Sequence, residues 1–279
     1  MSIAGFFVIT RPVNAVVSGV TAVIACLIAT GTVIPPAVLL LVIVTLITAA
    51  GNVINDYFDA DIDRINRPDR PIPSGTVSLM AARGFAVILF LTGIAVALFT
   101  PPLCLALAAA NAVILVLYAA RLKSLPLAGN VTVAYLAASI FLFGGAFAGP
   151  DALVRMIPLA VITFLATMAR EILKDAEDVE GDAAGGADTL PIRLGIRSTT
   201  RIALGFALAA AIMGVIPFTW WGPWYLAGIV IVDILIMAAA IRALSCETPA
   251  SMKASGVTTI IKAGMFAALA VFALSAIFL

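Results

Sequence analysis

Nine long apolar stretches, each close to the length that crosses a bilayer, constrain this chain more than any other feature of its sequence. A hydrocarbon core of roughly 30 Å needs about 20 apolar residues in a helix. Pro and Gly pairs separate several neighbouring stretches, which indicates tight connections. We therefore predict an all-α polytopic membrane protein with nine transmembrane helices, at residues 13–29, 36–53, 81–99, 102–120, 129–147, 153–172, 202–219, 224–241 and 258–278.

The composition agrees with a chain that lies mostly within a bilayer. Hydrophobic residues make up 63% of the 279 residues and charged residues 11%, and the mean hydropathy is +1.18. A soluble domain has about 45–50% apolar and about 25% charged residues. These proportions exclude an ordinary soluble enzyme, a disordered chain and a nucleic-acid-binding protein. We expect one integral-membrane domain over residues 1–279.

The charged residues gather on one face of the predicted bundle. With nine spans, the N-terminus and every second connection share a face, and 15 of the 16 Lys and Arg residues lie on it, the exception being Arg155. An excess of Lys and Arg marks cytoplasmic loops. We therefore predict a multi-pass protein of the cell membrane whose charged face is cytoplasmic. The long connections of that face, 54–80 and 173–201, are the expected place for an active site.

Two acidic clusters with one spacing are the most specific motif in the chain. Both read Asp-x2-Asp-x3-Asp, with Asp56, Asp59 and Asp63 in the first and Asp175, Asp178 and Asp182 in the second. Steps of three and four place side chains on one face of a helix, so each cluster should form an acidic stripe. Solvated acids beside a membrane would not explain the same spacing twice. The repeat also suggests that helices 1–4 and 5–8 are an internal duplication, with helix 9 added.

Such stripes favour a bound divalent cation. Like charges at helical spacing repel one another by roughly a few tenths of a kcal/mol per pair, and a metal ion would neutralise them. The chain has no His, and Cys26, Cys104 and Cys246 share no ligand spacing and suit packing. Ligands that are oxygen only select a hard ion, Mg²⁺ before others. Because Mg²⁺ shares its shell with phosphate oxygens, two facing stripes suggest a clamp around a diphosphate.

Polar and cationic side chains accompany the two clusters and are candidates for binding the substrate. They stand next to an acidic motif, in the proline-rich stretch 66–75, at the end of the fourth span or inside an apolar span. Cations of this kind bind phosphate oxygens and stabilise a departing diphosphate. The candidates are Asn14, Asn52, Asn55, Arg67, Arg70, Tyr118, Lys123 and Lys174. Asp233, near mid-membrane, is expected to make a helix contact or to pair with Lys262.

On nine helices, Asn55-Asp56-x2-Asp59-x3-Asp63 and Asp175-x2-Asp178-x3-Asp182 resemble the motifs of the UbiA superfamily of intramembrane prenyltransferases. The resemblance covers nearly the whole chain. It implies a helical bundle around a central cavity under a cytoplasmic cap, with Mg²⁺ on both motifs and a lateral opening for lipid tails. It also implies that the six carboxylates hold the diphosphate of a prenyl donor, assisted by Lys123, Arg67 and Arg70.

Within that family, residues 66–75 and 170–182 look most like the archaeal ether-lipid branch. This resemblance implies Mg²⁺-dependent transfer of a geranylgeranyl group from geranylgeranyl diphosphate to the free hydroxyl of geranylgeranylglyceryl phosphate, a lipid acceptor. Membrane lipids would surround the protein, and no nucleic acid or obligate protein partner is implied. The spacing of five between Tyr118 and Lys123 also favours this branch.

Two other functions remain open from the sequence. One is prenylation of an aromatic acceptor for quinone or tetrapyrrole synthesis. The other is cation transport, because acids inside membranes can mark ion paths. For the phosphate of a lipid acceptor, Arg70, Arg193 and Arg197 are candidate partners, and the segment 181–188 is a candidate lid.

Overall fold

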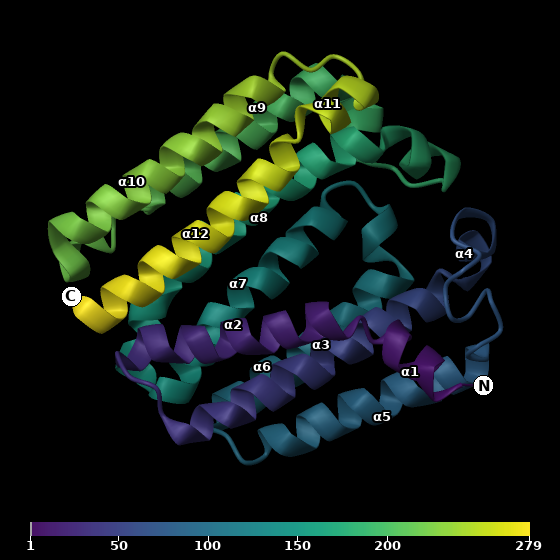
Figure 1. Ribbon diagram of the computed structural model, residues 1–279, viewed down its shortest axis with the longest axis horizontal. Coiled ribbons are helices and arrows are strands. Elements are labelled where there is room, and N and C mark those ends of the chain that lie inside the picture. The colour runs from purple at the N-terminus through teal and green to yellow at the C-terminus, as the bar shows by residue number, and fades with distance from the viewer. Residues whose placement is uncertain (1) are drawn as a thin grey trace.

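The computed structural model describes residues 2–279, and these residues form helices and their connections (Figure 1). Within them, nine helices are long and apolar enough to cross a membrane, as predicted. They are α2 (Pro12–Thr30), α3 (Val38–Phe58), α5 (Leu79–Ala97), α6 (Pro102–Ala120), α7 (Ala128–Ala148), α8 (Pro150–Ala184), α9 (Leu190–Met213), α10 (Phe218–Ala243) and α12 (Val257–Phe278). Shorter elements lie between them: α1 (Ile3–Ile9), η1 (Pro35–Ala37), α4 (Ala60–Asn66), η2 (Leu122–Ser124) and α11 (Pro249–Ser255).

Proline and glycine set several of the helix ends. Pro12, Pro102 and Pro150 each occupy the first position of a long helix, where the missing N–H removes no helical hydrogen bond. Gly31 ends α2 at a φ of 71°, a left-handed conformation that a residue with a Cβ adopts at a cost. Tight turns at such positions let consecutive helices run antiparallel.

The bundle has two halves, which meet where α2 of the first half packs against α7 of the second (Figure 1). In the first half α3 packs against α2, α5 and α6, and in the second α8 packs against α7 and α9. The buried apolar residues likewise form two clusters, one in each half. The second span is thus central to each half, which is the arrangement that a duplication would leave. The duplication itself stays a prediction.

A close backbone contact joins the two halves where α2 meets α7. A Cβ added to Gly144 would lie 2.6 Å from the backbone carbon of Ala25 and 2.7 Å from the backbone nitrogen of Cys26. Small residues allow helices in membranes to approach in this way and gain packing. Cys26, like Cys104 and Cys246, is buried and free, as expected for a packing residue.

The structure corrects the predicted connection 173–201. The helix α8 continues without interruption to Ala184, and α9 already begins at Leu190, so only residues 185–189 connect them. The seventh span accordingly ends at Met213 rather than at residue 219, and it is broken at Gly195, whose φ is 75°. The sequence of α8 becomes polar where the helix leaves the bilayer. The helix itself continues, because Lys, Glu and Ala are good helix formers.

Candidate functional site

The first acidic motif straddles a break between two helices. Asp56 lies in the last turn of α3, Asp59 occupies the junction, and Asp63 lies in α4. The prediction of one stripe on one helix is therefore wrong for this motif. The break nevertheless keeps two of the acids together, since Nη1 of Arg70 lies 3.2 Å from Oδ1 of Asp56 and 2.6 Å from Oδ2 of Asp63. Both carboxylates are buried.

Lys123 completes a second group around Asp59. It lies in η2, directly after α6, and its ammonium contacts the Asp59 carboxylate and donates to Oδ1 of Asn55 at 3.2 Å. Asn55 in turn donates from Nδ2 to Oδ2 of Asp59 at 2.9 Å. Lys123, which lies more than 60 residues further along the chain, thus joins Asn55 and Asp59 of the first motif in one hydrogen-bonded group.

Arg11 belongs to the site, although the sequence analysis counted it only among the charges of its face. Its Nη2 donates to Oδ1 of Asp56 at 2.5 Å, so Asp56 receives two guanidinium groups. Arg11 precedes the first residue of α2 and has a left-handed backbone, with a φ of 49°. The signal in the sequence was an arginine before Pro12, at the point where the first span begins on the charged face.

The second acidic motif lies on the continuous helix α8, as its spacing predicts. Nδ2 of Asn130, in α7, donates to Oδ2 of Asp175 at 2.8 Å, while Lys174 and Asp178 are exposed. The segments that carry the two motifs meet beyond the bundle, where a Cβ on Gly185 would lie 3.2 Å from Cδ1 of Ile62 in α4. We call this end of the bundle the motif end. A cap that covers the cavity from the motif end stays a prediction.

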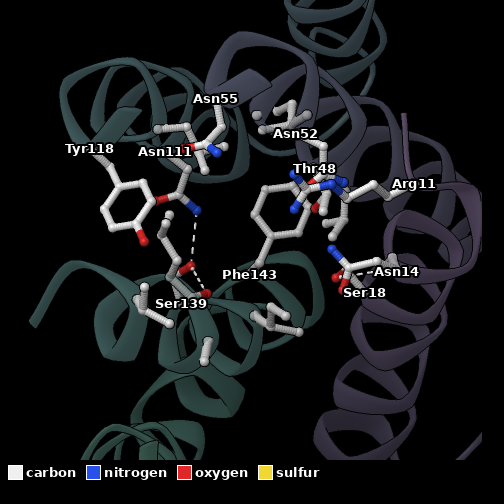
Figure 2. A pocket seen from close by; sticks show the side chains of 18 of the residues that line it. Arg11, Asn14, Ser18, Thr48, Asn52, Asn55, Asn111, Tyr118, Ser139 and Phe143 are labelled. Atoms are coloured by element: carbon white, nitrogen blue, oxygen red, sulfur yellow. Dashed lines mark hydrogen bonds between the residues drawn. The ribbon is translucent and has the colours of Figure 1, made fainter. Parts of the chain in front are cut away.

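A cavity of about 560 Å³ lies between the halves of the bundle, one helical turn inside the motifs. Asn52 and Glu171, which precede Asp56 and Asp175 by one turn, both line it. Figure 2 shows amides, hydroxyls and Arg11 turned toward this space. The candidate residues that line it are Asn14, Asn52, Asn55, Tyr118 and Lys174.

Polar side chains in this first cavity are held by specific hydrogen bonds. Nδ2 of Asn52 donates to the carbonyl oxygen of Thr10 at 2.9 Å, which ties α3 to the turn before α2. Asn111 of α6 donates to Oγ of Ser139 in α7 at 2.9 Å (Figure 2). Buried amides with such partners fix the helices around the cavity. Neither Asn111 nor Ser139 is among the site residues predicted from the sequence.

A second cavity of about 390 Å³ adjoins the first and lies in the second half of the bundle, which contains α8, α9, α10 and α12. Five residues line both cavities: Asn14, Val133, Ala137, Ile140 and Glu171. The second cavity is mainly apolar, with four ionisable side chains on its wall: Arg170, Glu171, Asp233 and Lys262. No ion pair joins Asp233 to Lys262 within residues 2–279. Of the two expectations for Asp233, the helix contact is the one observed, because its Oδ2 lies 3.3 Å from the place of an added Cβ on Gly214, at the end of α9.

Three predicted cations lie away from both cavities. Arg67 is exposed, and so is Arg197. Arg193 forms a two-bond ion pair with Asp188, and the hydrogen bonds from its guanidinium hold the pKa of the Asp188 carboxyl below its usual value. The described structure thus brings Arg70 and Lys123 to the motifs and leaves these three arginines outside.

The donor set at the motif end suits Mg²⁺. In the described part of the chain no group of three acidic, His or Cys side chains is arranged to hold a metal ion by itself. One nitrogen of Arg70, however, bridges Asp56 and Asp63, so a single cationic centre fits between these two carboxylates. Mg²⁺ is commonly bound by one or two carboxylates together with water and substrate phosphates. The first motif offers that pair, and Asp175 offers a further oxygen ligand.

Comparison of the chain with known proteins identifies its family. Residues 18–270 match the UbiA prenyltransferase family. The chain is 61% identical to digeranylgeranylglyceryl phosphate synthase of Methanoregula boonei, over 100% of both chains. It is also 61% identical to the protein of that name from Methanoculleus marisnigri, over 99% of this chain and 100% of the relative.

Solved structures of similar fold agree with that assignment. One, from work on a digeranylgeranylglyceryl phosphate synthase in membranes, has a TM-score of 0.88 and 34% identity and covers 99% of each chain. A UbiA homologue from Archaeoglobus fulgidus bound to GPP and Mg²⁺ has a TM-score of 0.72 and 18% identity, over 95% of this chain and 99% of that one. At that identity the second likeness concerns the fold alone.

Proposed function

The chain belongs to the UbiA prenyltransferase family, and on that premise we propose that it moves a geranylgeranyl group from geranylgeranyl diphosphate to the free hydroxyl of geranylgeranylglyceryl phosphate. The observation that carries the prenyl transfer is the layer of cations and carboxylates at the mouth of a buried cavity. The choice of acceptor rests on relatives that are 61% identical over their whole length. Membership of a prenyltransferase family argues against a cation transporter.

We propose that the motif carboxylates bind Mg²⁺ and that three cations bind the diphosphate of the donor. Mg²⁺ would supply charge neutralisation of the leaving diphosphate. Arg11, Arg70 and Lys123 contact the acids of the first motif, and Arg11 lines the cavity as well. Charge-assisted hydrogen bonds from such groups to phosphate oxygens are strong, and they strengthen as the oxygens gain charge.

The bond that breaks joins carbon 1 of the prenyl chain to the diphosphate oxygen, and the diphosphate leaves with the electron pair. The allylic cation that remains needs a site with little water, and apolar residues such as Ile47, Leu115 and Phe143 form part of the wall of the first cavity. The acceptor hydroxyl oxygen then bonds to carbon 1 and forms the ether. Its proton passes to a carboxylate or to a diphosphate oxygen, since the chain has no His.

We further propose that the motif end faces the cytoplasm. The excess of Lys and Arg on that side supports this orientation. Substrates made in the cytoplasm would then reach the cations of the site directly.

Product formation by the purified protein in detergent tests the proposed reaction. Labelled geranylgeranyl diphosphate and Mg²⁺ are supplied with geranylgeranylglyceryl phosphate or with 4-hydroxybenzoate, each with and without EDTA. We expect a glycerol ether with two prenyl chains and its loss in EDTA. Transfer to the aromatic ring alone would contradict the acceptor but keep the prenyl transfer. No product from folded protein with either acceptor would contradict the proposed reaction.

A further inference from the structure

The reaction proposed above needs room for a second lipid besides the donor. Its acceptor has a long prenyl chain at one end and a charged glycerol phosphate at the other. The first cavity lies at the diphosphate-binding cations, which assigns it to the donor. The second cavity adjoins it in the other half of the bundle, and its wall is mainly apolar, with residues such as Phe141, Leu269 and Phe272.

One helix face in the second cavity presents two unused hydrogen-bond donors. Thr167 is 4% exposed, and no group within the described residues forms a hydrogen bond with its Oγ1. Arg170, one turn further along α8, has a buried Nε that is likewise without a partner, while its Nη1 contacts Glu171. A buried donor without a partner destabilises the folded protein. Two such donors on adjacent turns, both lining one cavity, point to a ligand that accepts hydrogen bonds.

Lys262 supplies a second positive charge at the same cavity. It lies in the second turn of α12, near the motif end, and it is exposed while lining the cavity. The cavity therefore reaches the surface of α12 at a level near the membrane–water boundary. The phosphate of a membrane lipid lies at that level, and a lysine there can extend its ammonium toward it.

The two acids on the wall of the second cavity, Glu171 and Asp233, do not prevent a phosphate from binding beside Lys262 and Arg170. Glu171 is held by Arg170. Asp233 lies by Gly214, where its Oδ2 is 3.3 Å from the place of an added Cβ. Gly214 follows the end of α9 that is remote from the motif end, so Asp233 lies toward the opposite side of the cavity from Lys262.

On these grounds, and resting on the proposed function, we infer that the second cavity is the acceptor site. Lys262, Arg170 and the Thr167 hydroxyl bind the phosphate of the prenylated glycerol phosphate, and the apolar wall holds its chain. Glu171 and Asn14, which line both cavities, mark the passage through which the acceptor hydroxyl meets the donor. This assignment replaces Arg193 and Arg197 as partners of the acceptor phosphate.

Steady-state kinetics of Lys262→Met test the inference. The substitution keeps the apolar stem and removes the charge, and Lys253→Met, an exposed lysine of α11 outside both cavities, is its control. We expect the KM for geranylgeranylglyceryl phosphate to rise about ten-fold or more in Lys262→Met, with the KM for geranylgeranyl diphosphate unchanged. With geranylgeranylglycerol, which lacks the phosphate, Lys262→Met and the native protein should react alike.

A second variant keeps the test decisive if Lys262→Met folds poorly. Thr167→Val preserves shape and removes the unused hydroxyl, and it should raise the same KM in the same acceptor-dependent way. An unchanged KM for the phosphorylated acceptor in both variants, or an equal change with both acceptors, would overturn the inference while the reaction stands. If the native protein makes no ether at all, the proposed function fails, and the acceptor site fails with it.

Discussion

At the scale of single residues, the site is a balance between carboxylates and cations that the chain supplies from distant positions. Asp56 forms ion pairs with Arg11 and Arg70, and Asp59 forms one with Lys123. These ion pairs hold the carboxylates in place at the mouth of the cavity. The same pairing places the cations next to the proposed position of the substrate's diphosphate oxygens.

The first motif offers a matched pair of acids for mutation. We expect Asp56→Asn to lower the rate of prenyl transfer about 100-fold or more, because it removes a charged group that positions two arginines and a metal ligand. Asp61→Asn is the control, since Asp61 is exposed and, among residues 2–279, forms an ion pair with Arg64 alone. Turnover by purified protein of normal size-exclusion profile is the measurement. A near-normal rate in Asp56→Asn would contradict the role of the motif.

Arg11 can be tested as a ligand of the donor. Arg11→Met should raise the KM for geranylgeranyl diphosphate about ten-fold, the loss expected for one hydrogen bond to a charged group. Arg64→Met removes an arginine from the same end of the bundle, one whose guanidinium is exposed and pairs with Asp61. Initial rates against donor concentration distinguish the two variants. Equal behaviour of both would show that Arg11 serves only as a surface charge.

At the scale of elements, the contact between α2 and α7 determines how the halves fit together. The first cavity is lined from both sides of this contact, by Asn14 and Ser18 of α2 and by Val133 and Ala137 of α7. A wider separation of these helices would therefore change the cavity as well as the packing.

We expect Gly144→Ala to destabilise the bundle, because its Cβ would lie 2.6 Å from backbone of α2. Overpacking of this kind costs about 1–3 kcal/mol. Gly84→Ala is the matched control, since a Cβ there would meet no atom of the described residues within 4 Å. Thermal denaturation in one detergent should show a lower midpoint for Gly144→Ala alone. A midpoint equal to that of Gly84→Ala would mean that α2 and α7 separate at no cost.

At the scale of the whole molecule, the orientation in the membrane decides which compartment supplies the substrates. Asp151 lies in the first turn of α8, at the end remote from the motifs, and Glu247 lies between α10 and α11 at the motif end. Both are exposed, whereas the three native cysteines are buried. Cysteines introduced at these two positions therefore report on opposite sides of the membrane.

In intact cells, a membrane-impermeant maleimide should label Asp151→Cys at once and Glu247→Cys only after permeabilisation. The unsubstituted protein, with its buried thiols, gives the background. Labelling in the reverse order would place the motif end outside the cytoplasm and contradict the proposed orientation.

Much of this protein follows from local sequence alone. Membrane spans are long apolar runs, so their number and approximate position could be predicted, and the paired Asp-x2-Asp-x3-Asp motifs indicated the family and the candidate site. Lys123 and Arg70 were found because each stands beside a motif or a span end on the charged face.

The tertiary structure decided the rest, because it depends on contacts between residues far apart in the chain. The sequence could not show that Arg11 reaches Asp56, that Asn130 reaches Asp175, or that Arg67 is exposed and lines neither cavity. It also could not show the second cavity, which several helices form together. The hydrophobicity of a segment drives it into the bilayer as a helix, whereas the packing of helix against helix determines which polar side chains meet inside the bundle.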